Sequence, residues 1–201
     1  MAGYLVPVTT AEFRLTVKGS RFLSFCSPAP DVAAAEAQLA ERRRLHHDAT
    51  HHCWAYRIGI ATPLERSADA GEPSGSAGRP ILDALRRAGF TDAILVVTRW
   101  FGGTKLGKGN LARAYSEAAS GAIALLKTEL RIPTLNYTID SPYELIGVVE
   151  RCIAAHQGRI IHTDYAESTC IQLEIPAAAE AAFRQSLIEL SSNRIRIISN
   201  E

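Results

Sequence analysis

The spacing of apolar side chains along the first 128 residues predicts a sheet with helices packed against it. Alternating or β-branched stretches predict five strands, at 12–17, 21–26, 52–60, 64–68 and 91–98. Apolar residues at helical spacing predict three helices, at about 31–45, 80–88 and 110–127. The segment 91–98 contains Ala-Ile-Leu-Val-Val, which is too apolar for a strand with one wet face. This strand is therefore expected in the middle of the sheet.

Four residues predict where these helices begin and end. Asp31 and Asn110 are expected to cap the first and third helices, because a short polar side chain can accept from unpaired helical amides. Pro80 suits the first turn of the second helix, where a missing N–H costs nothing. Gly89 is expected to end that helix.

The pattern restarts near Leu130 as strand, helix, strand, strand, helix, strand. This order is the split βαβ, or ferredoxin-like, arrangement of about seventy residues. Its first helix is expected to be capped by Asp140 or Ser141, with Pro142 at its first position. The predicted fold class is α+β, with domains at 1–128 and 129–201.

Composition places the chain among ordinary globular proteins. Of its 201 residues, 47% are hydrophobic and 21% are charged. No apolar run approaches the roughly 20 residues that cross a bilayer, and the N-terminus lacks the pattern of a secretory signal. The four cysteines are scattered, without C-x-x-C spacing. Reduced cysteines and a cytoplasmic location are therefore expected, with no membrane partner.

The net charge of +1 hides a mild asymmetry between the two halves. Residues 1–129 contain 16 Lys+Arg and 12 Asp+Glu, whereas residues 130–201 contain 6 and 9. This bias is far from the strongly basic balance of a nonspecific nucleic-acid binder. Any site for an anion must therefore be local.

Two glycine-rich loops are the strongest candidates for such a site. They contain seven of the fourteen glycines: Gly71, Gly75, Gly78, Gly102, Gly103, Gly107 and Gly109. Such density outside a linker indicates a demanding backbone path or the close approach of a ligand. Five cations accompany the loops: Arg79, Arg99, Lys105, Lys108 and Arg113. Free amides and fixed cations together build an anion site, so the second loop and all five cations are predicted to bind phosphate or nucleic acid.

The second loop reads G-G-T-K-L-G-K-G, a near miss to the phosphate loop of nucleotide triphosphatases. Gly109 stands where the magnesium-binding hydroxyl would be, and no later apolar strand ends in an acidic residue. These differences disfavour a nucleotide triphosphatase, and a simple phosphate cradle or a tight turn needed only for packing is favoured over it. Asp69 and Glu72, in the first loop, are the kind of paired carboxylates that hold a metal or do acid–base work, but pairing with arginines such as Arg79 or Arg99 is favoured, which would support the cations.

Other candidate chemistry is weaker. His46, His47, His51, His52 and Cys53 look like metal ligands. In an extended strand, however, alternate side chains point to opposite faces, so no metal site is predicted. No nucleophile has a catalytic context, and no cofactor pocket is visible. Trp100 and Phe101 could stack on a base or pack in the core.

Three stretches carry a resemblance to a known family: H-H-C-W-A-Y at 51–56, A-G-E-P-S-G-S-A-G-R-P-I-L at 70–82, and V-V-T-R-W-F-G-G-T-K-L-G-K-G-N-L-A-R-A-Y-S at 96–116. The chain resembles the IMPACT family, in particular its bacterial YigZ-type members, over nearly its whole length. Three departures from the family pattern fall in these stretches. Trp100 stands where the family often has the tyrosine of R-Y-F. Ala70 replaces the Asp of the usual D-G-E-P, and Asn110 replaces the second glycine of the usual G-G-L.

The resemblance implies an N-terminal α/β sandwich like those of a ribosomal small-subunit protein and of small-molecule kinases. It also implies a C-terminal domain similar to those of elongation factor G. Eukaryotic members regulate translation during amino-acid starvation through a partner that bacteria lack. What carries over is a cytoplasmic protein linked to translation or RNA, with no established chemistry.

The leading hypothesis is a noncatalytic or weakly catalytic regulator that binds RNA or a ribosome-associated partner through the basic glycine-rich groove. The first alternative is an enzyme acting on a nucleotide or a phosphorylated small molecule. The second is a protein–protein adaptor in which the glycine loops serve packing alone.

Overall fold

The computed structural model describes residues 3–166, 168–192 and 194–200. The chain divides into two compact units, an N-terminal one at Tyr4–Arg131 and a C-terminal one that begins at Ile132. The division expected from the sequence, between 128 and 129, would cut the strand β7 (Thr128–Arg131). This strand pairs antiparallel with β1 (Tyr4–Pro7), which holds it in the N-terminal unit.

The N-terminal unit is built on an antiparallel sheet of order β2-β3-β6-β4-β5. Its strands are β2 (Ala11–Val17), β3 (Ser20–Pro28), β4 (His51–Ile58), β5 (Leu64–Ala68) and β6 (Ala93–Trp100). The central strand β6 is buried from Ala93 to Arg99. The apolar run therefore predicted its position correctly.

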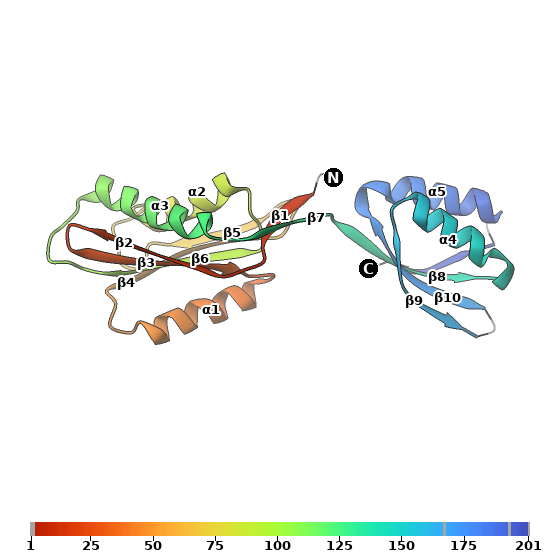
Figure 1. Cartoon of the computed structure of the whole chain (residues 1–201), viewed down its shortest axis with the longest axis horizontal. Helices are drawn as coiled ribbons and strands as arrows, with labels where there is room; N and C mark the ends of the chain where they lie inside the picture. The colour runs from red at the N-terminus through yellow and green to blue at the C-terminus, as the bar shows by residue number, and fades with distance from the viewer. Residues whose placement is uncertain (1–2, 167, 193, 201) are drawn as a thin grey trace. The chain divides into compact units, whose positions relative to one another are not determined.

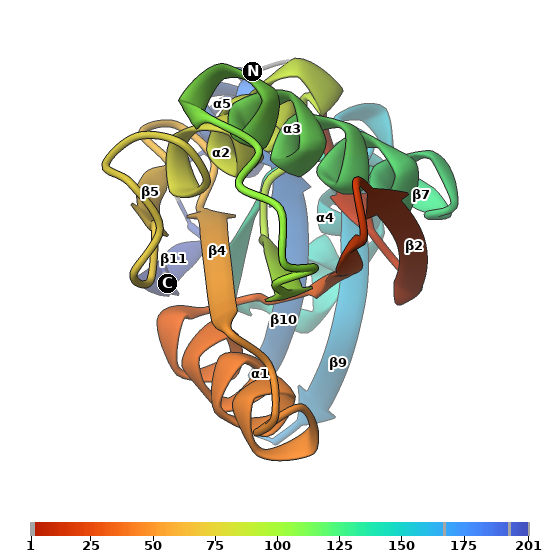
Figure 2. The same ribbon diagram turned by 90° about the vertical axis from the view of Figure 1, so that its left-hand side faces the viewer.

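Helices cover both faces of this sheet (Figure 1 and Figure 2). The helix α1 (Val32–Leu45) lies on one face, whereas α2 (Gly78–Ala88) and α3 (Lys108–Ala124) lie on the other. Alternation along β6 explains the two layers, because Leu95 and Val97 belong to the core under α2 and α3, while Ile94 and Val96 belong to the core under α1.

Two of the predicted helix ends are confirmed. The Ala34 N–H donates to Asp31 Oδ1 at 2.7 Å, and Gly89 ends α2 with φ 72°. The predicted Asn110 cap is wrong, because α3 begins two residues earlier, after Gly107 with φ 77°. Asn110 Nδ2 instead donates to the carbonyl of Leu106 at 3.0 Å, which braces the loop from inside the helix.

The C-terminal unit is a four-stranded antiparallel sheet of order β11-β8-β10-β9, with two helices on one face (Figure 1). Its main elements are β8 (Thr134–Ser141), α4 (Ile146–Ala155), β9 (Arg159–Tyr165), β10 (Thr169–Pro176), α5 (Glu180–Ser191) and β11 (Arg196–Asn200). This order confirms the ferredoxin-like prediction. Inward residues such as Ile139, Leu173 and Phe183 form its core.

The start of α4 differs from the prediction. Ser141 remains in β8, where it pairs with Thr169, so neither it nor Asp140 caps a helix. Pro142 precedes a single 3₁₀ turn at Tyr143–Leu145, and α4 itself starts at Ile146. No helix among the described residues is both long and apolar enough to cross a bilayer.

Candidate functional site

A cavity of about 460 Å³ lies where the two glycine-rich loops meet above the end of β6. The first loop contributes Glu72 and Pro73, and the second contributes Phe101 and the run from Lys105 to Lys108. The strands and α3 add the remainder of the wall, namely His51, Arg99 and Leu111. The cavity therefore combines charged groups with an apolar wall.

A buried ion pair forms one side of this cavity. Arg99 Nη1 donates to Glu72 Oε1 at 2.6 Å, and the Tyr115 hydroxyl donates to the same oxygen at 2.7 Å. The two charged side chains are only 6% and 4% exposed. Arg99 Nη2 also donates to Ser20 Oγ at 3.1 Å. The pair thus joins β6, the first loop, α3 and the start of β3, and the charge of Arg99 is already balanced.

The network continues to Cys53 and His51. Cys53 Sγ lies 3.2 Å from the Tyr115 hydroxyl and 3.0 Å from the carbonyl oxygen of Asp69. Burial raises the pKa of Cys53 to about 12 and also raises the pKa of Tyr115. Both groups are therefore protonated donors at neutral pH. His51 Nδ1 lies 2.9 Å from the carbonyl oxygen of Ala70, and its Nε2 lies 3.9 Å from Glu72 Oε1.

Asp69 does not pair with an arginine, contrary to the expectation for the first loop. Its carboxylate accepts from the amides of Gly75 at 2.8 Å and of Ala77 and Gly78 at 2.9 Å. The reason is that α2 begins directly after this loop, and its first amides have no acceptor within the helix. Burial acts to raise the pKa of Asp69, but these amide hydrogen bonds outweigh it and lower the pKa below its ordinary value.

Replacing Asp69 with asparagine is expected to lower the free energy of unfolding by about 1–2 kcal/mol at neutral pH, since one accepting oxygen is lost. The folded-state pKa is depressed, so the contribution is complete above the unfolded pKa of about 3.9 and disappears as the pH falls through the folded value. Urea denaturation should show a constant gap from pH 6 to 8 that closes below about pH 4. A gap that does not change with pH would contradict the role given to this carboxylate.

The second loop leaves its amides open. Gly107 provides no side-chain cap to α3, so the first amides of the helix, at Lys108, Gly109 and Asn110, have no acceptor within it. Lys105 and Lys108 are exposed beside them and line the cavity. Among the described residues, no carboxylate lies within ion-pair distance of either ammonium. The loop therefore presents two ammonium groups without an ion-pair partner at a helix N-terminus, although the charge of Lys108 also acts, more weakly than the amide hydrogen bonds, to lower the pKa of Asp69.

The cavity brings together five of the eleven predicted site residues: Glu72, Arg99, Lys105, Gly107 and Lys108. The remaining six lie elsewhere. The side chain of Arg79 is 78% exposed and pairs with Asp83 on α2, and Arg113 is exposed on α3 away from the cavity lining. Asp69 caps α2. Three glycines shape the loop without lining the cavity: Gly102, Gly103 and Gly109.

Sequence reasoning did not assign several residues that complete the site. For His51 and Cys53 the sequence favours packing and hydrogen bonding at the start of a strand over metal binding, and it gives them no place in the anion site, yet both face the first loop. Among the described residues, no group of three or more metal-ligating side chains gathers here. Tyr115 was assigned only to the buried stripe of its helix, and its hydroxyl reaches Glu72. No signal in the sequence distinguishes such a tyrosine from a core tyrosine.

Fold and site together define a two-domain α+β protein with an electropositive cavity on its first domain. The family model "Impact N-terminal domain" matches residues 18–123, and "Domain of unknown function (DUF1949)" matches residues 139–194. The chain belongs to the IMPACT family.

Bacterial relatives match along the whole chain. The IMPACT family member YigZ of Escherichia coli K12 is 31% identical, with 100% of both chains covered. An IMPACT family member of Haemophilus influenzae is 32% identical, with 98% of this chain and 97% of the relative covered. YvyE of Bacillus subtilis is 30% identical, with 98% and 91% covered.

Solved structures agree with the fold. A crystal structure described as that of a hypothetical protein has a TM-score of 0.70 and 30% identity, covering 100% of this chain and 98% of that one. A crystal structure from Thermus thermophilus has a TM-score of 0.53 at 13% identity, covering 100% of this chain and 28% of that one. The second likeness concerns the fold alone.

Proposed function

We propose that this protein is a translation-linked regulator that binds RNA, free or within a ribosome-associated partner, through the cavity at the start of α3. Phosphate groups would bind the open amides of the helix together with Lys105 and Lys108. A cytoplasmic location and a part in the response to starvation belong to the same proposal, because translation takes place there and eukaryotic family members regulate it under stress. The names of the relatives support family membership and no more.

One observation carries this proposal. The backbone amides of the first glycine-rich loop have a side-chain acceptor, whereas the first amides of α3, where the second loop ends, have no side-chain cap in the described part of the chain. The amides of the first loop are occupied by the carboxylate of Asp69. Those at the start of α3 have no side-chain cap and lie beside Lys105 and Lys108. Open amides with adjacent cations attract an anion of phosphate size. Because Arg99 is already paired with Glu72, we assign it to holding the cavity wall together and not to binding the phosphate.

The direct test replaces Lys105 and Lys108 together with glutamine and measures binding of single-stranded RNA over a range of salt concentrations. Affinity at low salt is expected to fall about 10- to 100-fold. The slope of log affinity against log salt should decrease by about 1.4, since each contact with a single strand contributes about 0.7. A matched control, Arg66→Gln with Arg87→Gln, removes two exposed cations outside the cavity and should bind normally. Unchanged binding by the lysine variant would contradict the proposal and favour the adaptor alternative.

A second function, an enzyme acting on a nucleotide or a phosphorylated small molecule, is favoured by the buried carboxylate on the cavity wall. Glu72 has His51 Nε2 at 3.9 Å, and a volume of about 460 Å³ lies within the range of ligand pockets. Magnesium-dependent thermal stabilisation by ATP, in the absence of RNA binding, would support this alternative. RNA binding without such stabilisation would support the regulator.

A further inference from the structure

We propose that the RNA bound by this protein is a single strand that crosses the end of the N-terminal sheet and binds a second basic surface on the opposite face. This inference rests on the function proposed for the first cavity. The second surface is a hollow of about 360 Å³ on the face covered by α1. Four of the side chains that line it carry the argument: Arg14, Arg21, His46 and Trp100.

The strand register explains why these side chains gather. Thr16 pairs with Arg21, and Arg21 pairs with Trp100, so the three form one row across β2, β3 and β6. Arg14 lies two residues along β2 from Thr16 and therefore faces the same way. The core under α1 includes Ile94 and Val96 but not Trp100, four residues beyond Val96 on the same strand. This end of the sheet thus stays open.

The hollow presents two exposed arginines from neighbouring strands, Arg14 and Arg21. Among the described residues, no carboxylate lies within ion-pair distance of Arg14 or Arg21, although Asp48, whose pKa is lowered mainly by its hydrogen bond from Trp100, also feels the charge of Arg21. Arg43 and Arg44 are exposed at the nearby end of α1, where they also suit the helix dipole. The helix dipole is a sufficient reason for Arg43 and Arg44, whereas Arg14 and Arg21 lie on strands, where no helix dipole applies.

The aromatic side chain in the hollow favours a nucleic acid over other anions. The Arg21 guanidinium lies 5.0 Å from the centre of the Trp100 ring, and the ring of His46 meets it edge-on at 5.5 Å. Trp100 Nε1 donates to Asp48 at 2.9 Å, a bond that lowers the pKa of Asp48 and fixes the indole in place. Single-strand binders combine cations for the backbone with such aromatic surfaces for the bases.

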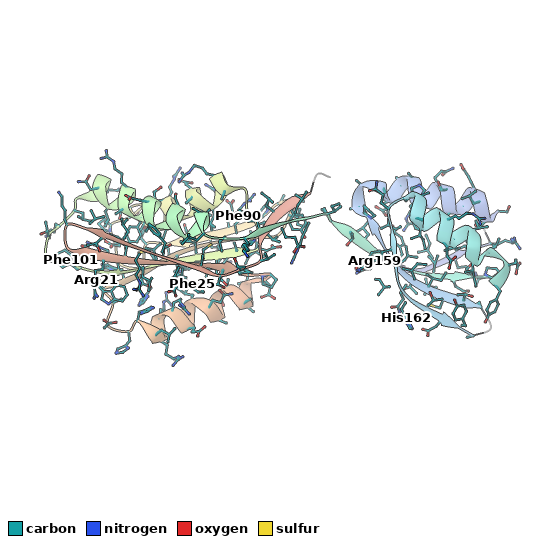
Figure 3. All side chains as sticks on the ribbon, viewed as in Figure 1. Arg21, Phe25, Phe90, Phe101, Arg159 and His162 are labelled. Carbon is teal, nitrogen blue, oxygen red and sulfur yellow. The ribbon has the colours of Figure 1, made fainter. Side chains whose placement is uncertain are left out.

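Adjacent residues of β6 connect the hollow to the first cavity. Arg99 and Trp100 are consecutive in an extended strand, so they point to opposite faces of the sheet. Arg99 lines the first cavity and Trp100 lines the hollow. Phe101, 47% exposed, follows them, and Figure 3 shows Phe101 and Arg21 at the same end of the unit. A polymer can contact both surfaces at once, whereas a single nucleotide cannot.

The test compares the double variant Arg14→Gln with Arg21→Gln against the matched control Arg66→Gln with Arg87→Gln. Binding is measured with single-stranded RNA of about 4 and about 12 nucleotides, within the range of site sizes of single-strand binders. The unmodified protein is expected to bind the longer strand at least about tenfold more tightly, and the double variant is expected to lose that advantage. The control should keep it.

A second measurement remains informative if the double variant folds poorly. Trp54 stacks on Tyr56 at 5.4 Å, away from the residues that line the hollow. A Trp54→Phe variant therefore leaves Trp100 as the sole tryptophan of the chain. Its fluorescence should change when the longer strand is added and stay constant with the shorter one.

Each outcome separates this inference from the function on which it rests. RNA binding that depends on Lys105 and Lys108, but not on Arg14, Arg21 or strand length, would overturn the inference and leave the proposed function standing. Absence of any RNA binding would overturn both. The inference would also be overturned if polyglutamate bound through Arg14 and Arg21 as tightly as the longer RNA strand does, because the hollow would then select for negative charge alone and not for a nucleic acid.

Discussion

Replacing Glu72 with glutamine is expected to lower the free energy of unfolding by about 3–5 kcal/mol, because it leaves the buried Arg99 guanidinium without a counter-charge. Both side chains are almost completely buried, and the Glu72 oxygen that accepts from Arg99 also accepts from Tyr115. Arg99 Nε is buried and already lacks a partner among the described residues, so no spare acceptor compensates for the loss. Equilibrium urea denaturation measures the change.

Two companion variants show whether charge is the cause. Glu129→Gln breaks an ion pair with Arg131 whose side chains are 57% and 48% exposed, and it should cost less than about 1 kcal/mol. Adding Arg99→Met to Glu72→Gln removes the unpaired charge and should recover part of the lost stability. If Glu72→Gln cost no more than Glu129→Gln, the buried pair would not be a main support of the cavity wall.

Local signals in the sequence predicted much of the fold. The apolar run in β6 placed that strand at the centre of the sheet, and Asp31 and Gly89 marked helix ends correctly. The restart near Leu130 predicted the ferredoxin-like order of the C-terminal unit. These features depend on residues close together in the chain or on a periodic pattern, and both are visible without coordinates.

The contacts of the candidate site could be predicted only in part. Glu72 and Arg99 were expected to pair, although 27 residues separate them. Asp69 was expected to do the same, yet its carboxylate binds amides six to nine residues ahead. Whether the Asp69 carboxylate binds an arginine or backbone amides depends on the path that the loop follows in space. Composition identifies the candidate partners, and only the three-dimensional path selects one of them.

The second basic surface lies beyond sequence reasoning for a related reason. Arg14, Arg21 and Trp100 come from three strands, and the register of the sheet alone places them together. The sequence suggested that Trp100 and Phe101 act beside Arg99, whereas alternation sends Trp100 to the opposite face. Arg99 and Trp100 therefore line two separate surfaces at one end of the sheet, where the sequence predicts a single groove.

Replacing Gly102 with alanine should damage both surfaces together. A Cβ at this position would lie 1.9 Å from the carbonyl carbon of Gly19 and 2.2 Å from the amide nitrogen of Ser20. These are backbone atoms of the β2–β3 turn, so relief requires the turn or the second loop to move. The Gly102 amide also donates to Ser20 Oγ at 3.2 Å, and the same oxygen accepts from Arg99. We expect a loss of about 3 kcal/mol or more in the free energy of unfolding.

Gly109→Ala provides the matched control, since a Cβ there would meet no atom within 4 Å and the residue lies in the first turn of α3. Alanine in a helix removes the entropic cost of glycine, so stability should rise by up to about 1 kcal/mol while the backbone amide in the first turn of α3 is kept. Thermal unfolding of both variants measures the contrast. If Gly102→Ala were as stable as Gly109→Ala, the close approach of the second loop to the β2–β3 turn would be wrong. The proposal that one RNA strand contacts both surfaces would then be weakened, because the contact between Gly102 and the β2–β3 turn holds the second loop over the end of β6.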